Sequence, residues 1–138
     1  MKISVCMATY NGASFVEAQV ISILDQLRCV DELVIVDDCS SDATFDLVSR
    51  ITDTRIRLYQ NETNRKEVYT FERAISLANG DFIFLADQDD IWEPRKVGET
   101  IDHLNREHAC LVSSNFLWID ALGRNIDVAV DGVSSSDS

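Results

Sequence analysis

The chain has 138 residues, the length of one domain with a sizeable core, and its 46% apolar and 26% charged residues are ordinary for a soluble globular protein. Its 24 acidic residues outnumber its 12 basic ones, so the formal net charge is −12. This excess argues against nucleic acid or an anionic membrane as the main partner, because phosphate groups attract clustered lysine and arginine.

Cysteine and hydropathy patterns exclude two further classes. The four cysteines form no Cys-x-x-Cys pair, and neither histidine lies at a zinc spacing from them, so we expect reduced thiols in a cytoplasmic protein. No run of about 18 apolar residues exists, so no membrane span is expected. Residues 1–8 lead into the turn Tyr10-Asn11-Gly12, which favours a first strand over a signal peptide.

Strand and helix patterns alternate along the first part of the chain. The apolar residues 3–8 predict a strand. Residues 14–17, Ser-Phe-Val-Glu, are typical of a capping box at the start of a helix. The continuous apolar run 33–36 predicts a buried parallel strand, and Ser40 and Ser41 are expected to cap a second helix.

The same alternation continues in the second part. Residues 55–60 alternate in polarity and predict an edge or half-exposed strand. Residues 71–78 have helical spacing, and Gly80 stands where that helix should end. The apolar residues 82–86 predict another buried strand, and Pro94 fits the first position of a fourth helix.

The order of these elements predicts the fold class. Residues 109–113 indicate a further strand, which residues 116–119 continue or pair with, and residues 131–138 indicate a flexible tail. We therefore expect one α/β domain over residues 1–130, with a mostly parallel, Rossmann-like sheet sandwiched by helices.

Three carboxylates, those of Asp87, Asp89 and Asp90, follow the apolar run 82–86. In an extended segment, residues two apart point to the same side, so Asp87 and Asp89 are candidates to share a cation. Ligands that are all oxygen suit Mg²⁺ or Mn²⁺, while Asp90 is expected to cap the next turn. The alternative is a solvated acidic loop without a ligand.

Other polar residues follow the first two predicted strands, and ligands of such sheets bind at the carboxyl ends of strands. Tyr10 offers a flat ring to a nucleotide base, next to Thr9 and Asn11. Asp38 can accept a ring N–H of a pyrimidine, and Asp37 can orient the turn or the ribose. A role for both aspartates as helix caps carries equal weight.

Three ordered segments resemble the family 2 glycosyltransferases, and the resemblance covers about residues 2–125. They are Ser4 to Gly12 (SVCMATYNG), Val34 to Asp42 (VIVDDCSSD) and Ala86 to Pro94 (ADQDDIWEP). The Asp-Gln-Asp-Asp-Ile-Trp segment is most similar to the bacterial branch that includes rhamnosyltransferases of surface polysaccharide synthesis.

The resemblance implies a GT-A fold and a nucleotide-diphosphate-sugar donor, with a UDP- or dTDP-sugar favoured. In this likeness Tyr10 stacks on the base and Asp38 binds its ring, while Asp87 lies near the ribose or sugar. Asp89 ligates Mg²⁺ or Mn²⁺ on the diphosphate, as Lewis-acid catalysis requires. A hydroxyl of a saccharide or lipid-linked acceptor then attacks with inversion, assisted by a carboxylate base.

Members of the family continue well beyond 138 residues, which implies that the base lies in the following segment. The chain is therefore expected to be the donor-binding half of an enzyme in the cytoplasm, with peripheral membrane association open to the longer protein. Neither Asp120 nor Asp127 matches that base, and Asn64 to Glu67 lacks the glycine usual in this loop.

Three alternatives remain open at this point. A donor-binding module without turnover fits the missing base. A receiver domain of signalling proteins also carries an acidic pair such as Asp37-Asp38, but it carries the pair after its first strand and needs a lysine after its last. A D-x-D phosphotransferase needs a small hydroxyl residue shortly after the motif, where this chain has Asp90-Ile91-Trp92.

Overall fold

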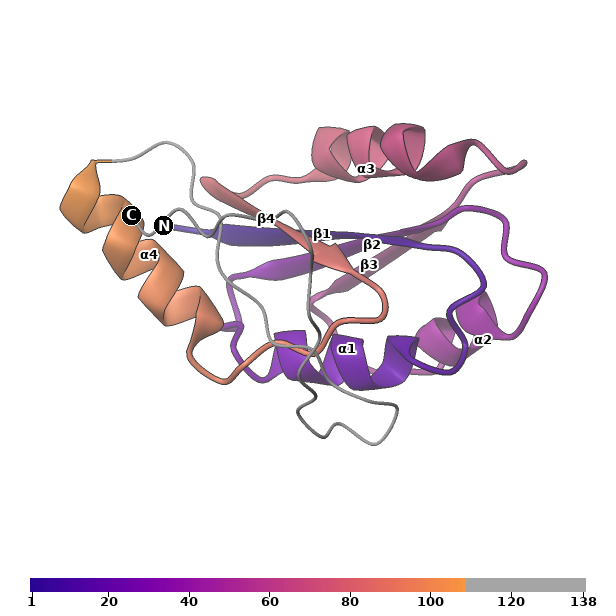
Figure 1. Cartoon of the computed structure of the whole chain (residues 1–138), viewed down its shortest axis with the longest axis horizontal. Coiled ribbons are helices and arrows are strands. Elements are labelled where there is room, and N and C mark those ends of the chain that lie inside the picture. Colours follow the sequence, from indigo (N-terminus) through magenta and orange to yellow (C-terminus); the bar gives the residue numbers. More distant parts are fainter. Residues whose placement is uncertain (109–138) are drawn as a thin grey trace, which may run out of the picture. The chain divides into compact units, whose positions relative to one another are not determined.

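Residues 1–108 of the protein are described by a computed structural model (Figure 1). Strands and helices alternate, as the sequence predicts. In chain order the elements are β1 (Ile3–Thr9), α1 (Val16–Leu24), β2 (Glu32–Asp37), α2 (Thr44–Ser49), β3 (Ile56–Gln60), α3 (Lys66–Leu77), β4 (Phe82–Asp87) and α4 (Lys96–Glu107). The strands predicted at 109–113 and 116–119 and the tail at 131–138 lie outside the described residues.

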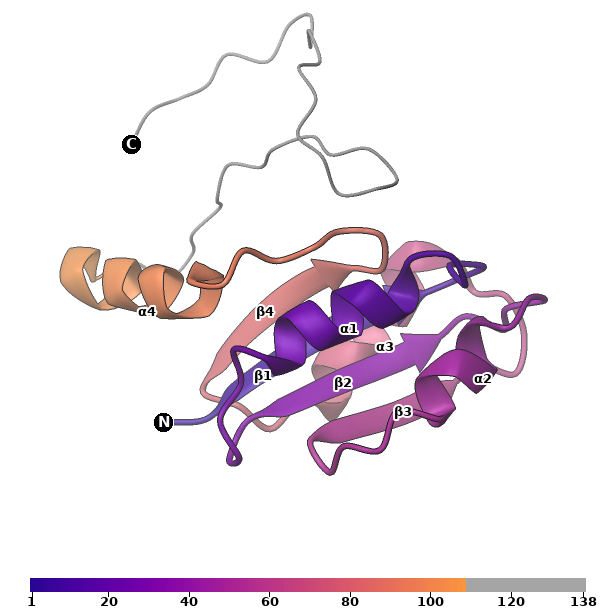
Figure 2. The same ribbon diagram turned by 90° about the horizontal axis from the view of Figure 1, so that it is seen from below.

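The four described strands form one parallel sheet in the order β3-β2-β1-β4. The predicted α/β class is confirmed, and β3 lies at one edge as its alternating pattern indicates. The register pairs Thr9 with Asp37 across β1 and β2, and Ala8 with Asp87 across β1 and β4. The carboxyl ends of these three strands therefore lie side by side (Figure 2).

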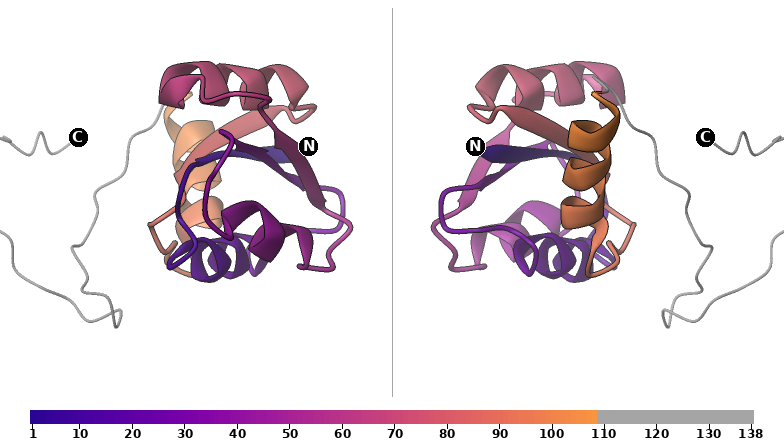
Figure 3. Two further views of the ribbon diagram at one scale, coloured as in Figure 1. Left: turned by 90° about the vertical axis from the view of Figure 1, so that its right-hand side faces the viewer. Right: turned by 90° about the vertical axis from the view of Figure 1, so that its left-hand side faces the viewer.

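Helices cover both faces of the sheet. Helix α3 packs on β1 and β2 from one side, and α1 and α2 lie together on the other (Figures 1 and 3). Strand β2 is buried along its whole length, which explains its continuous apolar sequence. The chain divides after Asp102 into two units, and the sheet belongs to the first. None of the described helices is long and apolar enough to cross a membrane.

Strand β4 differs from the prediction that residues 82–86 are buried. Ile83 and Leu85 are 46% and 57% exposed, whereas Phe84 and Ala86 on the opposite face are buried. Among the described residues β4 is an edge strand that pairs with β1, and α3 packs over β1 and β2 instead. An apolar run alone does not distinguish a strand covered on two faces from one covered on a single face.

The predicted capping box at the start of α1 is wrong. The helix begins at Val16, and no side chain caps its first turn. The amides of Phe15 and Val16 donate instead to the carbonyl oxygen of Gly12, at 3.0 and 2.9 Å. The chain thus enters α1 through a backbone turn, so Ser14 is not needed as a cap.

The predicted caps of the second helix and the predicted start of the fourth are also wrong. Helix α2 begins at Thr44 without a side-chain cap, while Ser40 and Ser41 bond to residues of the preceding loops. Helix α4 begins at Lys96 rather than at Pro94, and the Lys96 amide donates to the Glu93 carbonyl at 3.0 Å.

Candidate functional site

Three loops meet at the carboxyl edge of the sheet. Residues 9–11 end β1, residues 37–38 end β2, and residues 87–90 end β4. Because β1 lies between β2 and β4, its loop has an aspartate-bearing loop on either side. The structure thus brings together the three segments that the sequence analysis singled out.

The loops after β1 and β2 are joined by hydrogen bonds of Asn11, and each loop has one residue in the left-handed region. Asn11 has φ 47° and Cys39 has φ 61°. The Asn11 amide donates to Ser40 Oγ at 3.0 Å, and its side-chain oxygen accepts from the Ser41 amide at 2.9 Å. The Tyr10 ring, 46% exposed, remains open to solvent beside this junction.

The carboxylate of Asp37 organises the turn after β2. It is completely buried and accepts four hydrogen bonds: from the Ser40 amide and hydroxyl, from Thr9 Oγ1 at 2.7 Å, and from Gln60 Nε2 at 3.2 Å. Four bonds fill the acceptor positions of a carboxylate. In this structure Asp37 therefore orients the turn, and the Thr9 hydroxyl serves the same purpose.

Asp38 is 3% exposed and has one acceptor position left. Its Oδ1 accepts from Asn61 Nδ2 at 2.9 Å and from the Arg65 amide at 2.7 Å, and its Oδ2 accepts from the Lys66 amide at 3.0 Å. Asn61 is itself buried and donates also to Thr70 Oγ1 at 3.0 Å. These donors fix the direction in which the remaining lone pair points.

The loop that lacks the usual glycine has an unusual backbone. Lys66 has φ 71°, a conformation that favours glycine. The amides of Lys66 and Arg65 both donate hydrogen bonds to the Asp38 carboxylate. The Arg65 guanidinium lies 4.0 Å from the centre of the Tyr69 ring. The loop therefore reaches Asp38 through its backbone.

The loop after β4 concentrates negative charge. Asp87, Asp89 and Asp90 are exposed. Desolvation, followed by the charges of Asp87 and Asp89, raises the pKa of Asp90, although Lys96 acts in the opposite direction. Asp87 and Asp89 thus disfavour the charged form of Asp90, and a cation would relieve that repulsion.

The carboxylates of this loop suit Mg²⁺ or Mn²⁺ in an open site that substrate phosphates complete. Within residues 1–108, no three His, Cys, Asp or Glu side chains are grouped to hold a metal. Magnesium, however, commonly binds to one or two carboxylates together with substrate phosphates. Asp87 and Asp89 match such an open site better than a closed protein cage.

Two glutamines that the sequence analysis did not single out hold the acidic loop. Gln88 bonds to both backbone groups of Tyr10, and the buried Gln19 of α1 donates to the Asp87 carbonyl at 2.7 Å. Trp92 is 5% exposed and lies 5.8 Å from Phe84, ring to ring, so it packs beneath the loop. The sequence could not predict the role of Gln88, because its partner Tyr10 lies on the loop after β1.

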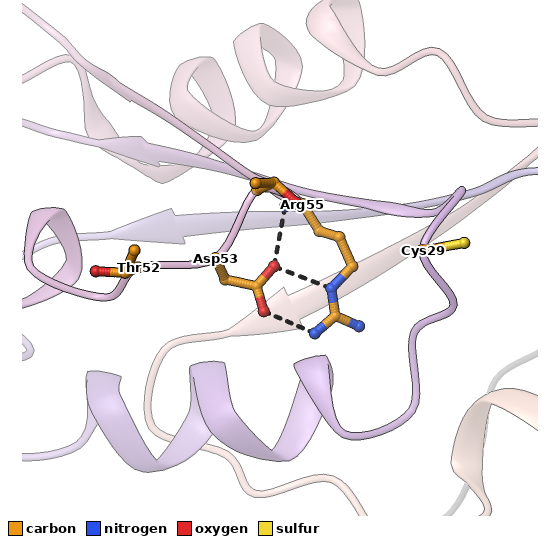
Figure 4. Close-up of a pocket in the computed structure, with 5 residues that line it drawn as sticks. Cys29, Thr52, Asp53 and Arg55 are labelled. Atoms are coloured by element: carbon orange, nitrogen blue, oxygen red, sulfur yellow. Dashed lines mark hydrogen bonds and ion pairs between the residues drawn. The ribbon is translucent and has the colours of Figure 1, made fainter.

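A separate hollow of about 400 Å³ lies at the opposite, amino end of the strands, beside the start of β3 (Figure 4). There the Arg55 guanidinium forks onto the Asp53 carboxylate, with Nη2 at 2.7 Å from Oδ2, and its Nη1 donates to the Leu24 carbonyl. These contacts fasten the end of α1 to β3. We read this hollow as structural because its charged groups are paired with each other.

Comparison with known families matches nearly the whole chain. The model of the family described as Glycosyl transferase family 2 matches residues 4–127. Among curated proteins, UDP-Glc:alpha-D-GlcNAc-diphosphoundecaprenol beta-1,3-glucosyltransferase WfaP of Escherichia coli is 31% identical over 134 residues, which are 97% of this chain and 51% of that protein. The chain spans about half the length of the curated relatives it matches.

Solved structures show the same fold. S. aureus TarS 1–349, in complex with UDP-GlcNAc, superposes with a TM-score of 0.71 at 28% identity, over 78% of this chain and 32% of that one. The mannosyltransferase PcManGT from Pyrobaculum calidifontis, in complex with GDP-Man and Mn²⁺, gives 0.69 at 26% identity, over 74% and 32%. The predicted GT-A architecture is thereby confirmed.

Proposed function

The chain belongs to glycosyl transferase family 2, and on that basis we propose that it forms the donor-binding part of an enzyme that transfers a sugar from a nucleoside-diphosphate sugar. The observation that carries the proposal is the meeting of an exposed tyrosine ring with two exposed carboxylates, on the loops of adjacent strands. An aromatic ring suits a base, and carboxylates suit a divalent ion on a diphosphate.

The nucleoside half of the proposed site uses the loops after β1 and β2. The Tyr10 ring stacks on the base, and the remaining lone pair of Asp38 accepts a ring N–H, as a uracil or thymine presents. Asn11 lines the same junction. Asp37 and Thr9 act indirectly in this proposal, because their hydrogen bonds hold the turn that presents Asp38.

The diphosphate half uses the loop after β4. Asp89, with Asp87 beside it, would hold Mg²⁺ or Mn²⁺, and the solved complex of PcManGT with GDP-Man and Mn²⁺ supports a divalent ion. Such an ion would neutralise the charge that develops on the leaving nucleoside diphosphate. In this proposal Asp87 also contacts the ribose or the sugar.

Transfer to the acceptor belongs to the whole protein. We propose that a hydroxyl of a saccharide or lipid-linked acceptor attacks the anomeric carbon with inversion, while a carboxylate base takes its proton. The name of the curated relative WfaP, with its diphosphoundecaprenol-linked acceptor, supports an acceptor of this class. Donor binding is the part of the reaction that we assign to residues 1–108, and it can be tested without the acceptor.

The receiver-domain alternative does not fit the site. Asp37 and Asp38 are 0% and 3% exposed, and their oxygens accept four and three hydrogen bonds. A phosphoryl-accepting carboxylate needs a free oxygen lone pair. Asp37 has none left, and the family that matches the chain is glycosyl transferase family 2.

Thermal unfolding of the full chain with UDP tests the proposal. With Mn²⁺ present, UDP at about 30 times its dissociation constant should stabilise the protein by about 2 kcal/mol and raise the melting temperature by several degrees. Asp89→Ala should remove the Mn²⁺-dependent part of this shift, because it removes a metal ligand.

Asp46→Ala serves as the matched control, since Asp46 is exposed on α2, away from the three loops. This variant should retain the full shift. If no nucleoside diphosphate (UDP, dTDP, GDP or ADP) changes the melting temperature of the unmodified chain, with or without Mn²⁺, the donor-binding proposal is wrong.

A further inference from the structure

Gln88, between the two candidate metal ligands, holds Tyr10 by both of its backbone groups. Gln88 Oε1 accepts from the Tyr10 amide at 2.8 Å, and Gln88 Nε2 donates to the Tyr10 carbonyl at 2.9 Å. These are the two bonds that a neighbouring strand would supply. We call this pair of bonds the Gln88 clasp.

The amide group of Gln88 occupies the space that a Cβ atom would need at Gly12. A Cβ built on this buried glycine would lie 2.3 Å from Gln88 Oε1 and 2.5 Å from its Cδ, far inside van der Waals contact. The φ of Gly12 lies outside the left-handed region, so its backbone accommodates other residues. A side chain at position 12 would therefore displace the Gln88 amide group, the flexible end of that side chain, from its place against Tyr10.

The clasp joins two loops that carry different parts of the proposed donor site. Tyr10 belongs to the nucleoside half, and Asp87 and Asp89 belong to the diphosphate half. Gln19 fixes the other side of the acidic loop through the Asp87 carbonyl, at 2.7 Å from a buried amide. A shift of either loop would therefore be transmitted to the other.

We propose that Gln88 is a positioning residue that couples metal binding to nucleotide binding, an inference that rests on the proposed donor-binding function. By holding Asp87 and Asp89 in register with Tyr10, the clasp lets the ion and the base be bound by the same molecule of nucleotide. Loss of the clasp should leave each half able to bind but should weaken the effect of one on the other.

Three variants of the full chain remove the clasp by different means. Gln88→Ala deletes both hydrogen bonds. Gln88→Glu keeps the size of the side chain but places an oxygen against the Tyr10 carbonyl and adds a charge beside Asp87 and Asp89. Gly12→Ala retains Gln88 but occupies the space of its amide group.

Gln26→Ala provides the matched control. Gln26 also bonds to backbone groups, accepting from the Val97 amide at 2.9 Å and donating to the Glu93 carbonyl at 2.7 Å and the Ser22 carbonyl at 3.3 Å. None of these bonds reaches Tyr10, and they fasten residues 93–97, which follow the acidic pair in the chain. The control therefore loses backbone bonds of the same kind while the Gln88 clasp stays in place.

Isothermal titration with UDP, with and without saturating Mn²⁺, measures the coupling as the ratio of the two dissociation constants. This ratio should fall about fivefold or more in the three clasp variants and stay within about twofold in Gln26→Ala. Association of Mn²⁺ with UDP in solution is the same for every variant and cancels in the comparison. A general loss of stability would lower both affinities without changing the ratio.

The outcomes separate the inference from the function on which it rests. If the unmodified chain shows Mn²⁺-dependent UDP binding and the clasp variants, folded by their melting curves, keep its ratio, the role of Gln88 is refuted and donor binding stands. If the unmodified chain binds neither UDP nor any other nucleoside diphosphate under either condition, the donor-binding proposal and the coupling fall together.

Discussion

Glu32 illustrates how one carboxylate is held at the amino end of the sheet. It is 4% exposed, and its oxygens accept from Ser4 Oγ at 2.6 Å, the Asn79 amide at 2.7 Å and Arg57 Nη1 at 2.9 Å. Burial alone would raise its pKa, but these hydrogen bonds and the charge of Lys2 outweigh burial and lower the pKa to about 2.

The pKa of Glu32 gives a prediction for acid stability. Because the folded value of about 2 lies below the ordinary 4.5, its contribution is complete above pH 4.5 and lost as the pH falls toward 2. Glu32→Gln should cost on the order of 3 kcal/mol at pH 7 and a little under half of that at pH 3, by urea unfolding.

Glu17→Gln is the comparison variant, because Glu17 is exposed in the first turn of α1. It should change the free energy of unfolding by less than about 0.5 kcal/mol at either pH. Equal losses for Glu32→Gln at pH 7 and pH 3 would contradict the stabilising role of the ionised carboxylate.

Residue types at the site were predictable, but their partners were not. Tyr10, Asp38, Asp87 and Asp89 stand out because they follow apolar strands, and parallel strands must bring their ends to one edge. Gln88 lies in the same motif, yet its partner, Tyr10, is 78 residues away. Long-range hydrogen bonds leave no local trace in a sequence.

At the scale of elements, the link between α3 and β4 depends on a glycine. Gly80 was expected to end the helix, but α3 ends at Leu77. A Cβ on Gly80 would lie 2.5 Å from the Ser4 backbone nitrogen, and the Gly80 amide donates to Ser4 Oγ at 2.7 Å. The link thus passes against β1 at a distance that no side chain permits.

Two glycine substitutions should therefore have opposite effects. Gly80→Ala forces the backbone of β1 to move and should lower the free energy of unfolding by about 1–3 kcal/mol. Gly98→Ala, within α4 and with no atom within 4 Å of its Cβ, should raise it by about 0.5–1 kcal/mol.

Chemical denaturation of both variants checks this pair. Equal effects of the two substitutions would show that intrinsic helix and turn preferences, rather than the approach to Ser4, decide the cost at Gly80.

Element types were predicted well, whereas element ends were not. The alternation of strand and helix was readable because apolar periodicity reflects the covered faces. The predicted caps failed because Ser40 bonds to Asp37 in its own turn and Ser41 bonds to Asn11 on the loop after β1, instead of to helix amides. Polar residues between elements have several possible partners, and the tertiary structure chooses among them.

At the scale of the whole molecule, the negative net charge affects the stability of the fold. The net charge of −12 makes the acidic groups repel one another on average. The ion pairs of the described residues include two that converge on the buried Glu32, at 2.9 Å from Arg57 and 3.4 Å from Lys2. Buried pairs are screened less by salt than exposed charges are.

Moderate salt should consequently stabilise the protein. Raising NaCl from about 20 to 300 mM shortens the Debye length from about 20 Å to about 6 Å and should raise the melting temperature. Differential scanning fluorimetry at neutral pH measures this change, with KCl as a check that the effect is not specific to sodium. A fall in melting temperature would mean that the ion pairs outweigh the general repulsion.

The sheet order has a consequence for how the molecule assembles. Hydrogen bonds between β1 and the β2 region close loops of 28 residues, whereas the Lys2–Asp81 bond that leads into β4 closes one of 79. Longer loops cost more entropy to close. A partly folded chain with only β1 and β2 paired would present Tyr10 and Asp38 without the acidic loop, so the complete constellation is a property of the finished fold alone.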